Sequence, residues 1–125
     1  LSRTEDDTAA IVRYIESHAD PSDRVLSDYQ ELNFHSRRAS TYHGAEISRA
    51  AVDSGIITAD VLISEIESDD VQMVIVDISP DTAHQLIALT EYEAFESYLD
   101  RVFHLTQTFD RQGQLLAVYE RVDAR

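Results

Sequence analysis

The sequence contains no cysteine and no tryptophan, and only three glycines and two prolines occur among its 125 residues. Without cysteine there is no disulfide framework, no thiolate metal site and no thiol nucleophile. Three glycines leave no room for a phosphate-cradling loop, and no Walker A, GxGxxG or GxSxG motif is present. These absences exclude thiol chemistry and the common nucleotide-binding and nucleophile-elbow motifs.

Lysine is also absent, so all ten basic residues are arginine, against 24 acidic residues and a formal net charge of −14. So acidic a surface repels phosphate backbones and anionic headgroups, and we expect no nucleic-acid partner. Self-repulsion at this charge disfavours the compact state, and salt screens it, because the Debye length falls from about 10 Å at 0.1 M to about 3 Å at 1 M. The lysine-free, aspartate-rich composition predicts a salt-adapted protein; the alternative is an ordinary acidic domain.

Long hydrophobic runs are missing as well. No stretch approaches the roughly 18 apolar residues that a membrane helix needs, and no signal-peptide pattern precedes the first predicted helix. Hydrophobic residues make up 43% of the chain, enough for a buried core, and we find no repeat or linker. We therefore predict one domain over residues 1–125, and the start at Leu1 leads us to expect a fragment of a longer protein.

Hydrophobic periodicity alternates between helical and extended patterns along the chain. Helices are predicted over residues 5–19, 59–68 and 91–100, with a helical turn at 29–34 and a further helix beginning at Pro80. Strands are predicted at 24–28 and 71–78, and alternation over residues 103–118 predicts a hairpin that turns at Asp110–Gly113. This order predicts an α/β fold in three layers, a mostly parallel sheet with flanking helices and an antiparallel C-terminal hairpin.

Local signals support individual elements of this prediction. The unbroken apolar run Met73–Val76 is typical of a central parallel strand that is buried on both faces. Thr58 is expected to cap the helix that follows it, and Thr90 with Glu93 forms a capping box before the last helix. Residues 39–57 give only a weak pattern.

Carboxylates follow two of the predicted strands. Asp28 with Tyr29 ends the first strand, and Asp77 ends the central one, followed by Ser79. Ligands of open α/β sheets gather at the carboxyl ends of parallel strands. Two carboxylates there can share a proton, ligate a cation or hold a sugar hydroxyl. The alternative is that each aspartate only caps the turn after its strand.

Polar and basic residues gather in the segment between the two strands. Asn33, His35, Arg37, Arg38 and His43 lie within eleven positions of a chain that is otherwise poor in cations. Adjacent arginines can grip a phosphate or a carboxylate through their forked donors. The alternative is that both arginines pair with surface acids and contribute little free energy.

The sequence contains no motif that marks a catalytic residue, a cofactor or a metal site. His35 and His43 are eight residues apart, and His84 and His104 fall in different predicted elements, so no HExxH-type spacing exists. Serine, histidine and aspartate occur without the local signature of a nucleophile.

Several segments together resemble the soluble C-terminal domain of multipass membrane glycosyltransferases, the protein-mannosyltransferase-like family that uses polyprenyl-phosphate sugars, in its halophilic archaeal type. The similar segments are DTAAIVRYI (7–15), DPSDRVLSDY (20–29), NFHSRR (33–38), SDDVQMVIVD (68–77), YLDRVFHLTQTF (98–109) and VYER (118–121). His35 and Ser36 stand where the family has small apolar residues and glycine, and residues 39–57 match nothing in it.

The resemblance implies a non-catalytic domain, because the catalytic acid of that family lies between early membrane helices that this chain lacks. It implies a place on the extracytoplasmic face of the cell membrane, beside the membrane-embedded part of the parent protein, and a glycan or polyprenyl-phosphate sugar as possible ligand. Two alternatives remain: a free-standing small-molecule or protein-binding module using the Arg37–Arg38 region, and an autonomous hydrolase built on Asp28 and Asp77.

Overall fold

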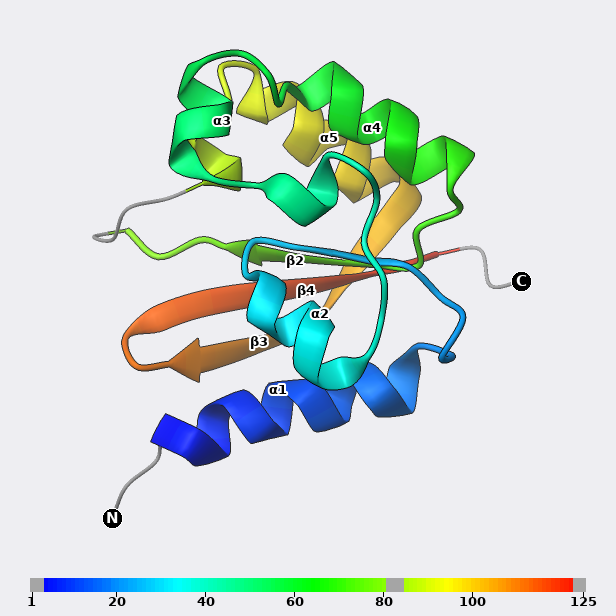
Figure 1. The fold of residues 1–125 in the computed structure, drawn as a ribbon, viewed down its shortest axis with the longest axis vertical. Helices are drawn as coiled ribbons and strands as arrows, with labels where there is room; N and C mark the ends of the chain where they lie inside the picture. Colours follow the sequence, from blue (N-terminus) through cyan, green and yellow to red (C-terminus); the bar gives the residue numbers. More distant parts are fainter. Residues whose placement is uncertain (1–3, 81–84, 123–125) are drawn as a thin grey trace.

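The computed structural model describes residues 4–80 and 85–122, which form a mixed α/β fold (Figure 1). Its elements in chain order are α1 (Thr4–His18), β1 (Val25–Ser27), α2 (Gln30–Ser36), the 3-10 turn η1 (Gly44–Glu46), α3 (Arg49–Asp53), α4 (Ala59–Ser68), β2 (Met73–Asp77), the 3-10 turn η2 (Leu86–Ala88), α5 (Tyr92–Val102), β3 (Phe103–Arg111) and β4 (Gln114–Arg121). Nearly all the predicted elements are present, and α3 is an addition within the weakly patterned segment.

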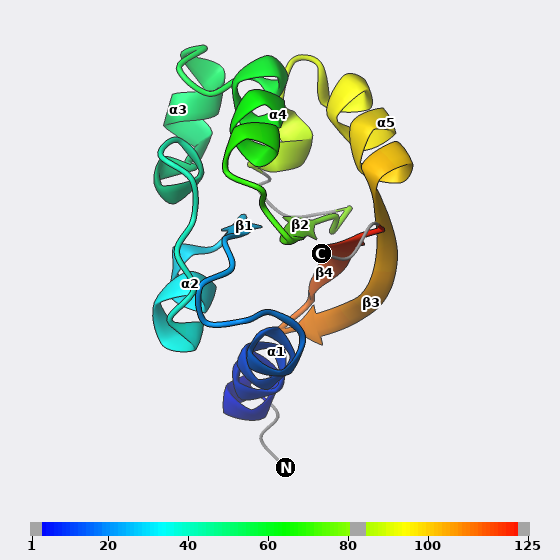
Figure 2. The same ribbon diagram turned by 90° about the vertical axis from the view of Figure 1, so that its right-hand side faces the viewer.

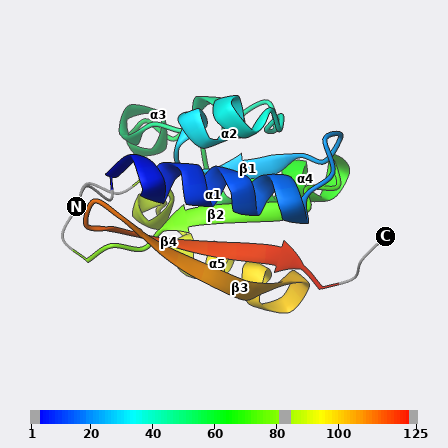
Figure 3. The same ribbon diagram turned by 90° about the horizontal axis from the view of Figure 1, so that it is seen from below.

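The four strands form one sheet in the order β1-β2-β4-β3 (Figure 3), and this order corrects the predicted topology. Only β1 and β2 are parallel, while β2–β4 and β3–β4 are antiparallel, so the expectation of a mostly parallel sheet is wrong. The predicted antiparallel C-terminal hairpin is present, and it extends the parallel β1–β2 pair at the β2 edge. Its second strand pairs directly with β2 and takes the edge that a further parallel strand would need.

Helices lie on both faces of this sheet, with α3, α4 and α5 on one face and α1 and α2 on the other (Figures 1 and 2). Successive residues of β2 point to opposite faces, as in any strand. Val74 and Val76 pack toward α4 and α5, whereas Met73 and Ile75 pack toward α1 and α2, and all four are buried. Burial on both faces explains the unbroken apolar run.

Helix caps agree with the sequence in one case and differ in another. The Thr58 side chain accepts a hydrogen bond from the backbone N–H of Val61, so the predicted cap of α4 is confirmed. Helix α5 instead begins after Glu91, without a side-chain cap, so the predicted capping box at Thr90 is wrong. The predicted helix from Pro80 includes residues 81–84, which lie outside the described residues.

The C-terminal hairpin turns at Gln112 and Gly113, both at positive φ, as a tight hairpin turn between two strands requires. A bulge at Thr106 shifts the register between Leu105 and Gln107. The extra residue changes which side chains face which layer. As a result Phe103 packs toward α5 and Phe109 toward α1, although they are six residues apart and would otherwise share a face.

Candidate functional site

The two predicted strand-end carboxylates lie side by side at the carboxyl ends of β1 and β2. Asp28 is only 2% exposed, and its side chain joins segments that are distant in sequence. Its Oδ2 accepts the backbone N–H of Asp77 (2.6 Å), and its Oδ1 accepts the backbone N–H of Leu86 (3.0 Å). The carboxylate of Asp28 therefore fastens the end of β2 and the start of η2 to β1.

Asp77 is buried beside it and is also enclosed by donors. One carboxylate oxygen accepts the backbone N–H of Ser79 (2.9 Å) and its hydroxyl, and the other accepts the hydroxyl of Tyr29. The Tyr29 hydroxyl in turn accepts from Gln114 Nε2 (3.1 Å). We call Asp28, Tyr29, Asp77 and Ser79 the strand-end network.

Charge and burial shift the proton affinities of this network. Burial raises the pKa of Asp28 to about 7, an effect that its two backbone N–H donors oppose and the neighbouring Asp77 reinforces. Burial and the hydrogen bond to Asp77 raise the pKa of the Tyr29 hydroxyl well above its ordinary value, so Tyr29 is a neutral donor. The guanidinium of Arg111 lies 4.7 Å from the centre of the Tyr29 ring and pairs with Glu31 (3.1 Å).

The strand-end network is chemically self-contained. Both oxygens of Asp28 and both oxygens of Asp77 already accept hydrogen bonds from the protein. Asp77 accepts a backbone N–H from the turn after its own strand, as the capping alternative supposes. Asp28 instead accepts backbone N–H groups of β2 and η2. A carboxylate that acts as a general acid or base must have an oxygen within hydrogen-bond reach of its substrate. Here each oxygen of the two aspartates already accepts a hydrogen bond from within the protein.

The second predicted cluster follows α2, and its two arginines have opposite environments. Arg38 is buried, and its guanidinium donates to the backbone carbonyls of Ser36 (2.7 Å), Ala19 (2.6 Å) and Glu16 (3.2 Å). The carbonyls of Glu16, in the last turn of α1, and of Ala19, directly after it, lie at the C-terminal end of the helix, where a cation is favoured. Arg38 thus joins α1 to α2 and uses its charge internally.

Arg37 points outward instead. It is the C-cap of α2 and has a left-handed backbone (φ 60°), a conformation that closes a helix. Its side chain is exposed, and none of the ion pairs between described residues involves it. The predicted arginine pair is therefore split, and only Arg37 is open to a ligand.

Asn33 and the two predicted histidines differ in their contacts. Asn33 Nδ2 donates to the backbone carbonyls of Val25 (2.8 Å) and Arg38 (2.9 Å), which ties α2 to β1. His35 is exposed on α2. His43 is held by Glu65 of α4 through its ring and its backbone N–H. Burial alone raises the pKa of Glu65, but hydrogen bonds from Thr41 and His43 outweigh it and hold that pKa below its ordinary value.

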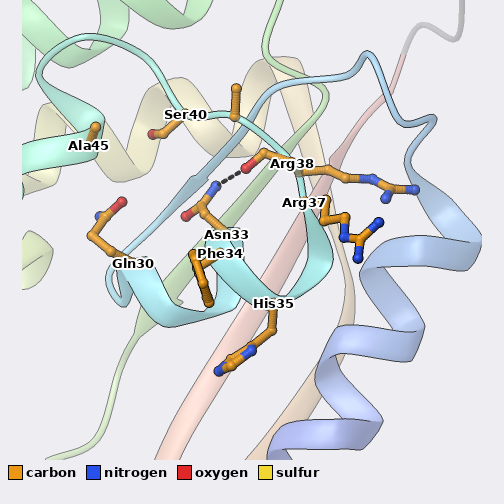
Figure 4. Close-up of a pocket in the computed structure, with 9 residues that line it drawn as sticks. Gln30, Asn33, Phe34, His35, Arg37, Arg38, Ser40 and Ala45 are labelled. Atoms are coloured by element: carbon orange, nitrogen blue, oxygen red, sulfur yellow. Dashed lines mark hydrogen bonds between the residues drawn. The ribbon is translucent and has the colours of Figure 1, made fainter.

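An open groove of about 710 Å³ runs along α2 and the loop after it (Figure 4). We call it the α2 groove. Four of the predicted residues line it: Asn33, His35, Arg37 and Arg38. The others do not line it, because Asp28, Tyr29 and Asp77 belong to the strand-end network and His43 contacts α4.

The structure adds lining residues that the sequence analysis did not single out. Gln30, Phe34 and Ser40 line the α2 groove, and the ring of Phe34 is 78% exposed. The sequence feature that could have identified Phe34 is a phenylalanine between polar residues of a short predicted helix. Gln114 and Arg111 complete the surroundings of Tyr29 from more than 80 residues away, and no local pattern predicts such a contact.

Within residues 4–80 and 85–122, no three histidine, aspartate or glutamate side chains form a group that could hold a metal ion. His84 lies outside these ranges. No helix of the described part combines the length and apolar character needed to cross a membrane. Comparisons of the chain with protein-family models, with curated proteins and with solved structures find no match.

Proposed function

We propose that this chain is a non-catalytic, salt-adapted domain of a membrane glycosyltransferase, which assists in positioning the acceptor or the donor. The observation that carries the non-catalytic role is the enclosure of Asp28 and Asp77, the only pair of residues for which the sequence suggests acid–base work. Each stabilises the fold through internal hydrogen bonds, and neither offers a carboxylate oxygen without an internal partner.

The glycosyltransferase assignment is supported by the sequence resemblance of the segments 7–15, 20–29 and 68–77. It places the domain on the extracytoplasmic face of the cell membrane, beside the membrane-embedded part of its parent protein. The gene sequence upstream of the Leu1 codon tests this assignment. We expect several apolar segments of about 20 residues there. A coding sequence with no such segment would overturn it.

The salt-adapted character is supported by the net charge of −14 and by the absence of lysine. Screening of self-repulsion should raise the melting temperature between 0.1 M and 2 M NaCl, by on the order of 10 °C for a gain of 2–4 kcal/mol in a domain of this size. Circular dichroism measures this change directly. Equal melting temperatures at the two salt concentrations would contradict the proposal.

A second candidate function is a free-standing binding module that uses the α2 groove. The observation in its favour is that Arg37 and Phe34 are both exposed on the same groove, one charged and one aromatic. Ligand sites combine such apolar surface with a few polar groups. An NMR titration with a sugar phosphate separates the two candidates: amide shifts clustered within residues 28–43 support a binding module, whereas an unchanged spectrum supports a domain that binds no free ligand.

A further inference from the structure

We propose that the α2 groove is a docking surface for an acidic segment of another protein, in which carboxylates flank an apolar side chain. This inference rests on the second candidate function, binding at the groove, and names the class of partner that is bound. Three features carry it: a lining without acidic residues, exposed arginines beside the groove and an exposed aromatic ring.

The charge of the lining is the first feature. Among the described residues, those that line the α2 groove include no aspartate or glutamate, although the chain has 24 acidic residues. Nearly all of the lining belongs to residues 32–45, the longest stretch of the sequence without an acid. Two further hollows, near the starts of α4 and α5, are lined in part by Asp60, Glu91 and Glu93. An anionic partner therefore meets repelling carboxylates in those hollows but not along the lining of the α2 groove.

The net charge of −14 opposes any anionic partner at a distance, and the salt concentration decides how far this repulsion extends. At about 1 M salt the Debye length is about 3 Å, so exposed charges interact only when they are nearly in contact. The side chains at the groove then matter more than the sum of charges over the protein. Local charge complementarity can therefore select an acidic segment in concentrated salt.

The shape of the surface favours a peptide segment. Gln30, Phe34 and Arg37 line the groove at the spacing i, i+4 and i+7, which places them along one stripe of α2. Figure 4 shows their side chains in this order along the helix. At 1.5 Å per residue the stripe is about 10 Å long, which equals about three residues of an extended peptide. A partner that contacts the whole stripe must therefore present an apolar group and an anionic group several ångströms apart.

Two exposed arginines supply the positive charge. Arg37 follows the last turn of α2, and Arg24 donates a hydrogen bond to the backbone carbonyl of Ser40, which lines the groove. Neither arginine takes part in an ion pair within the part of the chain that the structure describes. A guanidinium binds a carboxylate through two parallel donors. Because Ser40 and Arg37 lie apart in Figure 4, the two cations suit carboxylates at separate positions of one segment.

The ring of Phe34 supplies the apolar contact. At 78% exposure it is the most exposed large hydrophobic side chain of the described residues. Its one aromatic neighbour among them is His35, which lies edge-on with 5.3 Å between the ring centres. Aromatic residues and arginine together carry much of the binding free energy at protein interfaces. The partner segment should therefore place an apolar side chain on Phe34.

An NMR titration of the protein in 1 M NaCl tests this chemistry with three synthetic peptides. The first is acetyl-EDFEDE-amide; acetyl-EDSEDE-amide lacks its ring, and acetyl-QNFQNQ-amide lacks its charges. We expect saturable amide shifts within residues 30–45 for the first peptide, and an affinity about tenfold lower or less for each of the others. Equal affinity for the first and third peptides would overturn the recognition of acidic groups. Equal affinity for the first and second would overturn the contact with Phe34.

Matched variants assign the binding to the groove. Phe34→Ser should weaken binding of acetyl-EDFEDE-amide about tenfold, whereas Ile56→Ser, at an exposed position between α3 and α4, should leave it unchanged. Arg37→Met should also weaken it about tenfold, whereas Arg101→Met, at an exposed position of α5, should not. All four side chains are exposed, so circular dichroism should show the wild-type fold in each variant. Equal effects of a groove variant and its control would overturn the location of the docking surface.

The outcomes separate this inference from the function on which it rests. If acetyl-EDFEDE-amide shifts no amide within residues 30–45 but a sugar phosphate does, the acidic-segment partner is overturned and the binding module stands. If neither the peptide nor the sugar phosphate shifts these residues, both the inference and the second candidate function are overturned.

Discussion

The strand-end network and the α2 groove begin only two residues apart in sequence, at Asp28 and Gln30, and treat their polar groups in opposite ways. In the network each carboxylate oxygen has a partner within the protein, and burial excludes water. In the groove the cation of Arg37 and the aromatic ring of Phe34 are exposed. The polar groups of the network stabilise the fold, whereas Arg37 remains open to solvent. The comparison shows that chemical type alone does not assign a role.

The largest expected effect comes from breaking the network at Asp77. Asp77→Ala removes the acceptor of the half-buried Tyr29 hydroxyl and of the buried backbone N–H of Ser79, and should lower the free energy of unfolding by about 3 kcal/mol or more. Urea unfolding in 2 M NaCl measures this loss. Asp77→Asn retains one acceptor and should lose only about 1 kcal/mol. A loss below about 0.5 kcal/mol for Asp77→Ala would contradict the structural role of the network.

The next effect is the pH dependence that Asp28 confers. Its folded-state pKa of about 7 lies above the unfolded value near 3.8, so the folded state holds the proton more tightly. The resulting stabilisation is complete below the unfolded pKa and is lost as the pH rises through the folded one. Between pH 4.5 and 7.5 the stability of the wild type relative to Asp28→Asn should fall by about 3 kcal/mol.

The Asp28→Asn variant serves as the reference because it lacks this titration, while every other acidic group is common to both proteins. Its altered hydrogen bonds to Asp77 and Leu86 add a constant offset that does not depend on pH. Urea unfolding at four or five pH values gives the difference. A wild-type minus variant difference that stays flat over this range would show that Asp28 is ionised in the folded state at all these pH values.

The smallest effects compare two neighbouring arginines. Arg38→Met leaves the carbonyls of Glu16 and Ala19 without their donor and should destabilise the fold by about 2 kcal/mol. Arg37→Met changes an exposed side chain and should stay within about 0.5 kcal/mol of the wild type. Urea unfolding of both variants in the same buffer is the measurement. Equal losses would contradict the division between a structural and an available arginine.

Sequence patterns were sufficient where the physical cause is local. The apolar run of β2 and the Thr58 cap of α4 depend on neighbouring residues, and both agree with the structure. Helix α3 has a comparable signal, because the Ser48 side chain accepts the backbone N–H of Ala51, but its five residues are too few for a clear period. The sequence therefore predicts a helix well when a capping residue and a full hydrophobic stripe occur together.

Long-range pairing limited the rest of the prediction. Nothing near Val118 indicates that β4 pairs with β2, more than 40 residues earlier, and this pairing decides the sheet order. The different environments of Arg37 and Arg38 are equally invisible in sequence, because Arg38 is buried by α1, a helix that ends twenty residues before it. Composition could therefore locate the candidate site in the sequence. Only the tertiary contacts show which of its residues are structural and which are exposed.

The bulge at Thr106 bears on how the free edge of the sheet behaves as the salt concentration rises. It lies in β3, an edge strand, within a stretch from Val102 to Phe109 that carries no formal charge. Exposed edges invite pairing with another chain, and charged side chains are a common defence against it. At a Debye length of about 3 Å in 1 M salt, charge repels neighbours only at contact. An irregular backbone disrupts the pairing ladder at any ionic strength, so the edge is protected by its shape.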